Sequence, residues 1–298
     1  MQNKAKKILY CRSCKSKSLT GLFSLGSLAQ CGIFPQKKNQ IVKKYILSLV
    51  LCKNCFLVQL DRNSNISEMF GNEYGYRSAL NKSMIIHLKS KSKYLKKYLN
   101  KKKNLTIMDI GANDGTFLSN FYGERNINLY AIDPIMNKWK KFYPKNVNKI
   151  NDFFPTKKIN SKIKADLITS IACYYDLPDP LLFAKNVKDH LLQQGVWHIE
   201  LSYLPLMLKQ NSYDTICHEH LEYYSALSLS YIFKKSELKV IDVNFNDANG
   251  GSIALDIARS DSNYKISKKF DNLIKKEKKL GIQKFTIYKK FFDSIKTQ

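Results

Sequence analysis

A short apolar run that breaks into glycines constrains the fold of this chain more than any other feature. The run 105–110 is followed by the turn 111–115, which reads Gly-Ala-Asn-Asp-Gly, and apolar spacing then resumes. Glycines let a backbone turn sharply and approach a ligand closely, and a helix that opens after them presents unpaired N–H groups. The stretch therefore predicts a strand, a tight turn that holds a cofactor, and a helix over 115–122.

An acidic residue stands where such a fold would need one. The next predicted strand, 128–132, ends at Asp133, and nucleotide-binding α/β folds place there the carboxylate that receives ribose hydroxyls. From Asp109 the turn reads D-I-G-A-N-D-G rather than G-x-G-x-x-G, so it looks more like the S-adenosylmethionine (SAM) version of the fold than the dinucleotide version. A generic α/β turn without a ligand is the alternative.

Strand and helix patterns alternate from residue 105 onward, which predicts parallel strands in a doubly wound α/β sheet. A strand, an Asn-Gly-type turn and another strand then predict a hairpin at the end of the sheet. Five parallel strands closed by a hairpin fit a class I SAM-methyltransferase sheet, which is Rossmann-like. An amphipathic helix is expected over 81–98, and a Lys-rich, helix-like tail begins at Lys265. The predicted strands are 105–110, 128–132, 147–150, 166–172, 196–201, 240–245 and 252–258.

A polar and aromatic segment, 151–154, follows the third predicted strand of this sheet. A polar side chain there can meet an adenine edge, and an aromatic ring can stack on the base; core packing of Phe153 and Phe154 is the alternative. The predicted cofactor-binding residues are Asp109, Gly111, Asn113, Asp114, Gly115, Asp133, Asp152 and Phe153.

Two C-x-x-C pairs lie near the start of the chain, Cys11 with Cys14 and Cys52 with Cys55. Four thiolates from two turns can close a tetrahedral zinc site, which supplies folding energy that a small segment cannot draw from its core alone. A disulfide pairing is less favoured because no secretory signal precedes the cysteines, and a redox C-x-x-C normally occurs once. The pattern therefore predicts structural Zn²⁺.

The net charge of +26 would ordinarily suggest a nucleic-acid partner. The basic residues are nearly all lysine, whereas readers of bases and phosphates favour the planar arginine fork, so we expect mostly solvated surface with a secondary benefit for anionic substrates, and a nucleic-acid partner is not favoured. No apolar run approaches the ~18 residues of a membrane span, and the start of the chain lacks a signal-like apolar core, which predicts a cytoplasmic protein. The arginines are Arg12, Arg62, Arg77, Arg125 and Arg259.

A stretch inserted between the fifth strand and the hairpin, 202–226, carries the cluster His218-Glu219-His220. It follows the carboxyl end of a strand, the edge at which open α/β sheets bind ligands. Histidine takes up a proton near neutral pH, and an adjacent carboxylate can hold or polarise it. We expect catalysis from this cluster; metal ligation and structural hydrogen bonding are the alternatives.

The order of motifs resembles the SAM-dependent C-methyltransferases that act on nucleotide-linked keto-deoxysugars in bacteria. The matching motifs are the two C-x-x-C pairs, D-I-G-A-N-D-G, D-T-I-C-H-E-H-L-E-Y-Y-S and N-G-G-S. The resemblance implies that His220 is the base with Glu219 beside it, and that Tyr76 of the Y-x-Y-x-S loop meets the substrate. His218 and Tyr76 are candidate donors to the enolate oxygen. Cys217 stands where the family carries tyrosine.

The resemblance also implies an organisation in domains. We expect a zinc-binding domain over 1–65, a methyltransferase core over 66–262 and a helical tail over 263–298 that starts a truncated C-terminal domain. The family continues as a Rossmann-like C-terminal domain, so a short form, a fragment and a separate partner chain are the alternatives for this sequence.

The expected function is methyl transfer to a carbon alpha to the ketone of a nucleotide-linked deoxysugar. One rival is an N- or O-methyltransferase on nucleic acid or a small molecule. A base N-methylase typically shows N/D-P-P-Y/F after its fourth strand, but this place reads Ala-Cys-Tyr-Tyr-Asp over 172–176. The other rival is a zinc-ribbon binding module with an inactive methyltransferase fold.

Overall fold

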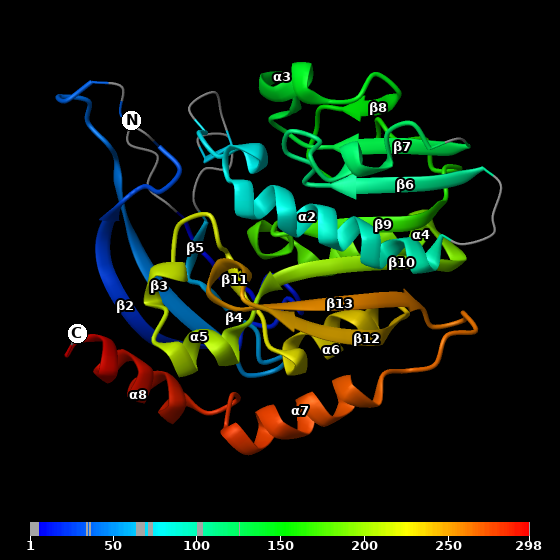
Figure 1. The fold of residues 1–298 in the computed structure, drawn as a ribbon. Coiled ribbons are helices and arrows are strands. Elements are labelled where there is room, and N and C mark those ends of the chain that lie inside the picture. Colours follow the sequence, from blue (N-terminus) through cyan, green and yellow to red (C-terminus); the bar gives the residue numbers. More distant parts are fainter. Residues whose placement is uncertain are drawn as a thin grey trace.

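A seven-stranded sheet forms the centre of the computed structural model, which describes residues 6–33, 35, 37–63, 69–70, 74–99, 104–124 and 126–297 (Figure 1). The strand order is β12-β13-β10-β9-β6-β7-β8, in which β6 to β10 are parallel and β13 is antiparallel to both of its neighbours. The predicted doubly wound sheet with a terminal hairpin is confirmed. The strands are β6 (Leu105–Ile110), β7 (Ile127–Ile132), β8 (Val147–Ile150), β9 (Ala165–Ile171), β10 (Leu191–Ser202), β12 (Leu238–Asn246) and β13 (Ser252–Arg259).

Helices cover both faces of this sheet (Figure 1). The predicted amphipathic helix is α2 (Lys82–Leu95). Asn81 caps its N-terminus, because the Asn81 side chain accepts a hydrogen bond from Ser83 N at 3.0 Å. It packs Leu88 and Leu95 on one face, and α4 (Pro180–His190) and α6 (Ala226–Lys235) pack on the other. Because side chains alternate along a strand, β6 supplies both cores. The short helix α3 (Met136–Trp139) follows β7.

The helix predicted over 115–122 is wrong. The chain forms only a single 3₁₀ turn, Leu118–Phe121, after the glycine-containing turn. Side chains compete here with helical hydrogen bonding, since the Asn120 amide donates to the carbonyl oxygens of Thr116 and Phe117, each at 3.0 Å. A single turn aligns few peptide dipoles, so its N-terminus attracts a ligand only weakly. Contacts to a ligand at this edge of the sheet would therefore come mainly from the loop and its side chains.

A second, four-stranded sheet has the order β11-β4-β3-β2. Three of its strands come from the cysteine-containing start of the chain, but β11 (Glu222–Tyr223) comes from the insertion, and Glu222 pairs with Gln59. The insertion thus contributes a strand to this sheet, which the sequence did not predict. The predicted boundary at 65/66 lies outside the described residues. The other strands are β2 (Leu19–Ala29), β3 (Lys44–Cys52) and β4 (Val58–Leu60), with β1 (Lys6–Lys7) pairing with β5 (Arg62–Asn63) nearby.

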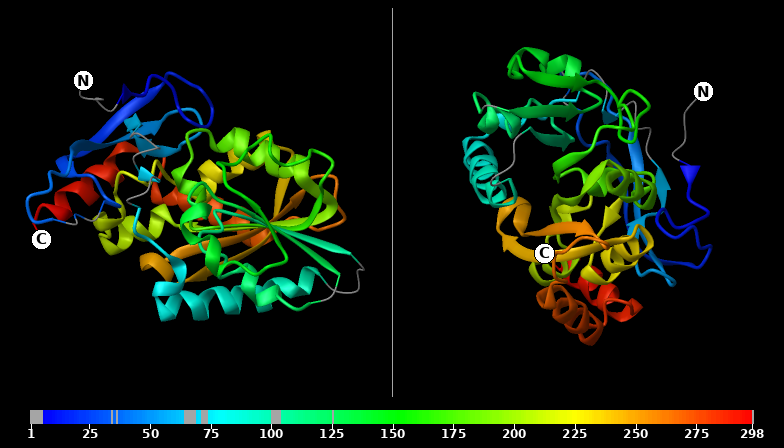
Figure 2. Two further views of the ribbon diagram at one scale, coloured as in Figure 1. Left: turned by 90° about the horizontal axis from the view of Figure 1, so that it is seen from above. Right: turned by 90° about the vertical axis from the view of Figure 1, so that its right-hand side faces the viewer.

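The tail is helical, as predicted, and it forms two helices, α7 (Lys268–Leu280) and α8 (Phe285–Ile295). α7 packs against α6 and β12, and α8, the red helix at the C-terminus, lies beside β2 (Figure 2). There Phe292 stacks on Phe23 with ring centroids 4.9 Å apart. The tail therefore contacts both sheets. Among the described residues, no helix is both long and apolar enough to cross a membrane.

Candidate functional site

A cavity opens at the carboxyl ends of β6, β7 and β9, where the strand order reverses. Aromatic side chains that precede α2, among them Tyr74 and Tyr76, cover part of it. Six of the eight predicted cofactor residues line this cavity: Asp109, Gly111, Asn113, Asp133, Asp152 and Phe153.

Gly111 allows a close approach between two turns at the edge of the sheet. Its φ of +77° is the left-handed region that glycine occupies without cost. A Cβ atom at this position would lie 2.8 Å from both Cβ and Sγ of Cys173, in the turn after β9. Any larger residue would push the two turns apart and so distort the cavity floor.

Two buried carboxyl groups face this cavity. Asp133 accepts hydrogen bonds from the backbone N–H groups of Asn113 and Ile135, each at 2.8 Å, which fixes its orientation. Burial raises the pKa of Asp133 to about 6, although these two donors oppose the rise. Burial likewise raises the pKa of Asp109 to about 7, against a hydrogen bond from Thr169 Oγ1 at 2.6 Å. A carboxylate oxygen has two lone pairs, so Asp133 retains capacity to accept ribose hydroxyls.

Asn113 and Asp114 hold the aromatic loop over the cavity. The side-chain oxygen of Asn113 accepts a hydrogen bond from Ser78 N at 2.9 Å, and that of Asp114 accepts one from Ala79 N at 3.0 Å. Asp114 does not line the cavity, and neither does Gly115, where a Cβ would lie 2.7 Å from the Tyr143 ring. The structure therefore gives these two residues supporting positions.

The two phenylalanines after β8 occupy different environments. Phe153 is 46% exposed and lines the cavity, and its ring lies edge-on to Phe70 with centroids 6.3 Å apart. Phe154 is 8% exposed and packs against Phe183 in the core. A stacking role for Phe153 and core packing for Phe154 are thus compatible. Asp152 lines the same side of the cavity and accepts a hydrogen bond from Thr156 Oγ1 at 2.7 Å.

His220 lies in the insertion with its ring orientation fixed. Nδ1 is 2.8 Å from the carbonyl oxygen of Thr215, and the ring packs on Tyr175 with centroids 4.3 Å apart. A carbonyl oxygen can only accept, so Nδ1 carries the proton and Nε2 of the neutral ring is the basic nitrogen. A second, small cavity beside His220 is lined by Tyr175, Ser202, Tyr203, Leu204, Met207, Thr215, Glu222 and Tyr223.

His218 and Glu219 face the start of the chain. Nδ1 of His218 accepts from Cys31 N at 3.4 Å, Nε2 donates to the Tyr45 carbonyl oxygen at 3.2 Å, and the side chain is buried. Glu219 Oε1 would lie 2.2 Å from a Cβ at Gly32. Burial raises the pKa of Glu219, and His220 opposes this. These contacts dock the insertion on the cysteine-containing segment.

Asp176 is a residue that sequence reasoning missed. It lines the first cavity, and its Oδ1 has no hydrogen-bond partner among the residues that the structure describes. Burial raises its pKa well above the ordinary value, and the charge of His220 is the strongest opposing influence. Asp176 thus places a buried carboxyl oxygen at the first cavity. Its position after the fourth strand was the available signal.

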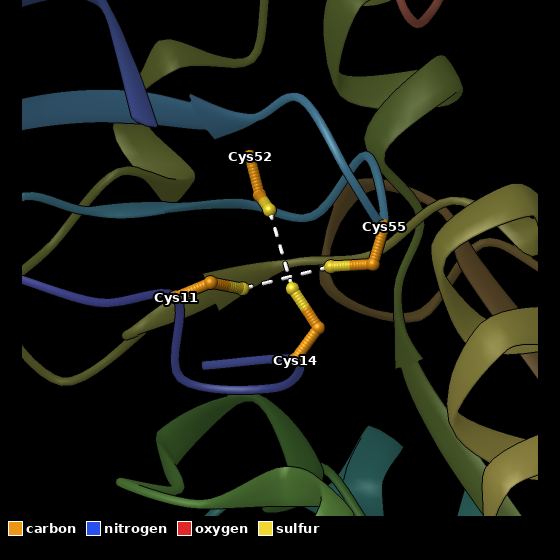
Figure 3. A group of neighbouring side chains, drawn as sticks. All are labelled: Cys11, Cys14, Cys52 and Cys55. Atoms are coloured by element: carbon orange, nitrogen blue, oxygen red, sulfur yellow. Dashed lines mark hydrogen bonds between the residues drawn. The ribbon is translucent and has the colours of Figure 1, made fainter. Parts of the chain in front are cut away.

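The four predicted zinc ligands converge at one point (Figure 3). Their sulfur atoms all lie within 4.8 Å of one another, with Cys11 3.5 Å from Cys55 and Cys14 3.4 Å from Cys52. Disulfide bonds would need S–S distances of about 2.05 Å. A tetrahedral Zn²⁺ with Zn–S bonds of about 2.3 Å holds sulfurs roughly 3.8 Å apart, so the cluster fits a structural zinc ion.

Comparisons with known proteins agree with this geometry. A family described as "Methyltransferase domain" matches residues 84–243, and one described as "Putative zinc binding domain" matches residues 11–70. The chain is 26% identical over 298 residues to the C-methyltransferase NovU of Streptomyces niveus, covering 98% of this chain and 70% of that protein.

Two of the similar solved structures are described as methyltransferases. The plantazolicin methyltransferase BpumL, in a complex with a substrate analogue and S-adenosylhomocysteine, is 14% identical, with a TM-score of 0.47 over 59% of this chain and 84% of that one. The mitomycin 7-O-methyltransferase MmcR is 13% identical, with a TM-score of 0.48 over 61% and 55% of the two chains.

The sheet order, the cavity at its switch point and the four-cysteine cluster define a class I SAM-dependent methyltransferase with a structural zinc site. SAM is its methyl donor. The chain belongs to the methyltransferase domain family.

Proposed function

We propose that this methyltransferase transfers a methyl group to the carbon alpha to the ketone of a nucleotide-linked deoxysugar, with His220 as the base. The observation that carries the proposal is the hydrogen bond from His220 Nδ1 to the Thr215 carbonyl oxygen, because it leaves Nε2 as a fixed proton acceptor. The similarity to a C-methyltransferase supports carbon as the acceptor atom.

The residues around the first cavity fit SAM. Gly111 lets the turns after β6 and β9 lie close together at the cavity floor, Asp133 offers oriented oxygens for ribose hydroxyls, and Phe153 with Asp152 offers a ring face and a polar edge for adenine. When bound, SAM supplies an electrophilic methyl carbon. Asn113 and Asp114 act on this site indirectly by holding the loop of residues 74–79.

His220 would remove the proton from the carbon next to the ketone, and the ketone oxygen then carries the developing negative charge. Two side chains at the first cavity can donate a hydrogen bond to that oxygen. Burial raises the pKa of Tyr76 above that of an ordinary phenol, so its hydroxyl carries a proton near neutral pH, and burial also raises the pKa of Asp176, which favours its protonated, donating form. His218 is engaged at both ring nitrogens, so we assign it a supporting position instead.

The proposal includes the division into residues 1–65, 66–262 and 263–298. The zinc site and β11 would hold the insertion over the edge of the main sheet. The nucleotide part of the substrate would be bound by this chain alone or together with a separate C-terminal-domain chain.

A substrate panel tests this function. Nucleotide-linked 4-keto-6-deoxysugars are incubated with methyl-labelled SAM, with and without a C-terminal partner chain, and products are analysed by NMR. We expect label on carbon next to the ketone. Label on oxygen or nitrogen, or label in a nucleic-acid control alone, would overturn the proposal. Calorimetry with SAM addresses the binding-module alternative, which predicts no heat of binding.

A further inference from the structure

The two ends of the insertion lie side by side. Tyr203 and Tyr224 form a backbone bridge, and Leu204 N donates to the Tyr224 carbonyl oxygen at 2.9 Å. The intervening chain, which includes α5 (Leu204–Gln210) and His220, is therefore a closed loop. The position of His220 depends on how firmly these ends are held.

One buried carboxylate from the tail reaches both ends of this loop. Glu277 of α7 is 1% exposed. Its Oε1 accepts hydrogen bonds from Ala226 N at 2.7 Å and from the Tyr203 hydroxyl, and its Oε2 accepts one from Leu227 N at 2.7 Å. Ala226 and Leu227 open α6, so the carboxylate also faces the positive end of a ten-residue helix.

Glu277 is connected to the surroundings of His220 through Tyr203, whose hydroxyl it binds. Tyr203 and His220 line the same small cavity, so a displacement of Tyr203 would change the space beside the imidazole. The tail makes a second contact with the loop, because Ser294 of α8 donates to the Asn211 side-chain oxygen at 2.9 Å. Glu277 differs from that half-buried contact in being fully buried and in touching both loop ends.

We propose that Glu277 is a positioning residue for methyl transfer, which holds the ends of the loop 203–226 and so keeps Nε2 of His220 aligned with the substrate. The inference rests on the proposed role of His220. It gives a function to the tail, in which the sequence shows no chemical motif.

The chemistry of the three hydrogen bonds indicates which substitution is informative. A carboxylate only accepts hydrogen bonds, and all three partners are donors. Glu277→Gln keeps the size but replaces one accepting oxygen with an NH₂ group, which would then face a backbone N–H. Tyr288→Phe is the matched control, because it keeps the ring of a buried tail residue that packs in the same apolar cluster as the loop and removes only a hydroxyl, which donates to the Ile282 carbonyl oxygen at 2.6 Å within the tail.

The experiment measures kcat, KM, the pH dependence of kcat, SAM affinity and amide hydrogen exchange for both variants and for His220→Gln. We expect Glu277→Gln to lower kcat by up to about 10²-fold, since a small misplacement of a reacting group has effects of that size. We also expect a shifted pH profile, unchanged SAM affinity and faster exchange in 203–226. Tyr288→Phe should lower the melting temperature with kcat and pH profile unchanged.

Two results would overturn the inference. One is wild-type kcat and pH profile in Glu277→Gln; the other is an equal loss of kcat in Tyr288→Phe at a matched melting temperature. The His220→Gln arm keeps the two proposals apart. If that variant retains turnover, the base assignment fails, and the exchange rates in 203–226 then decide whether Glu277 holds the loop.

Discussion

Asp133 binds the backbone N–H of Asn113 at 2.8 Å, and this hydrogen bond joins the acidic end of β7 to the turn after β6. Both residues line the cavity, and the side chain of Asn113 in turn holds the loop that carries Tyr76. The cofactor side and the substrate side of the proposed site therefore share one hydrogen-bonded support. The variants below separate groups that face the cavity from groups that support it.

Phe153→Ala and Phe154→Ala should behave differently. Phe153 is 46% exposed on the cavity, so its loss should weaken SAM binding and leave stability nearly unchanged. Phe154 is 8% exposed in the core, and its truncation should cost about 3–5 kcal/mol. Calorimetric titration and chemical unfolding of both variants check this. Equal SAM affinity in Phe153→Ala and wild type would argue against stacking.

Gly111→Ala should destabilise the protein more than Gly123→Ala. Both glycines have positive φ, +77° and +82°, so both variants carry the left-handed backbone cost of about 1–2 kcal/mol. Only Gly111 has atoms 2.8 Å from the new Cβ, whereas nothing lies within 4 Å at Gly123. Urea unfolding gives the two free energies. Equal unfolding free energies for the two variants would mean that the turn containing Cys173 shifts without cost.

The wild-type protein should bind one zinc ion per chain. Cys52→Ser should lower this zinc content, whereas Cys31→Ser should leave it unchanged. Only the first cysteine belongs to the cluster of four sulfurs. Because structural zinc contributes folding energy directly, Cys52→Ser should also lower the melting temperature. Elemental analysis of the purified variants measures the metal. Full zinc content in Cys52→Ser would contradict the assignment.

Asp256→Asn should weaken the acid dependence of stability. Burial pushes the pKa of Asp256 upward, but hydrogen bonds from His198 and from the tyrosines of α2 and the turn after it outweigh this and lower the pKa to about 2, from 3.8. The stabilisation is fully present above pH 3.8 and is lost as the pH falls toward about 2. Unfolding free energies over this pH range test the prediction.

The control for Asp256→Asn is Asp261→Asn. The Asp261 carboxylate forms an exposed ion pair with Arg259, and such pairs contribute little. This variant should keep the acid dependence of the wild type. If both variants showed the same change, the buried hydrogen bonds of Asp256 would not explain the acid sensitivity.

The sequence predicted the main sheet because its strands are apolar runs bounded by turn residues, and the predicted range 105–110 matches β6. It also predicted the zinc site, because the spacing of two C-x-x-C pairs is typical of four zinc ligands. It did not predict β11 or Glu277, because a two-residue strand and a single buried carboxylate leave no periodic pattern, and their partners lie far away in the sequence. Asp176 belongs to no motif, and its position after the fourth strand was the one sequence signal, so its place at the cavity identified it.

The most direct test of His220 as the base is exchange of the substrate α-proton with solvent. The keto-deoxysugar nucleotide is incubated in D₂O with enzyme and S-adenosylhomocysteine, so that proton removal is observed without methyl transfer. We predict deuterium at the carbon next to the ketone with the wild-type enzyme, and an exchange rate lower by about 10² to 10⁴ in His220→Gln at unchanged SAM affinity. Exchange at the wild-type rate in His220→Gln would contradict the account.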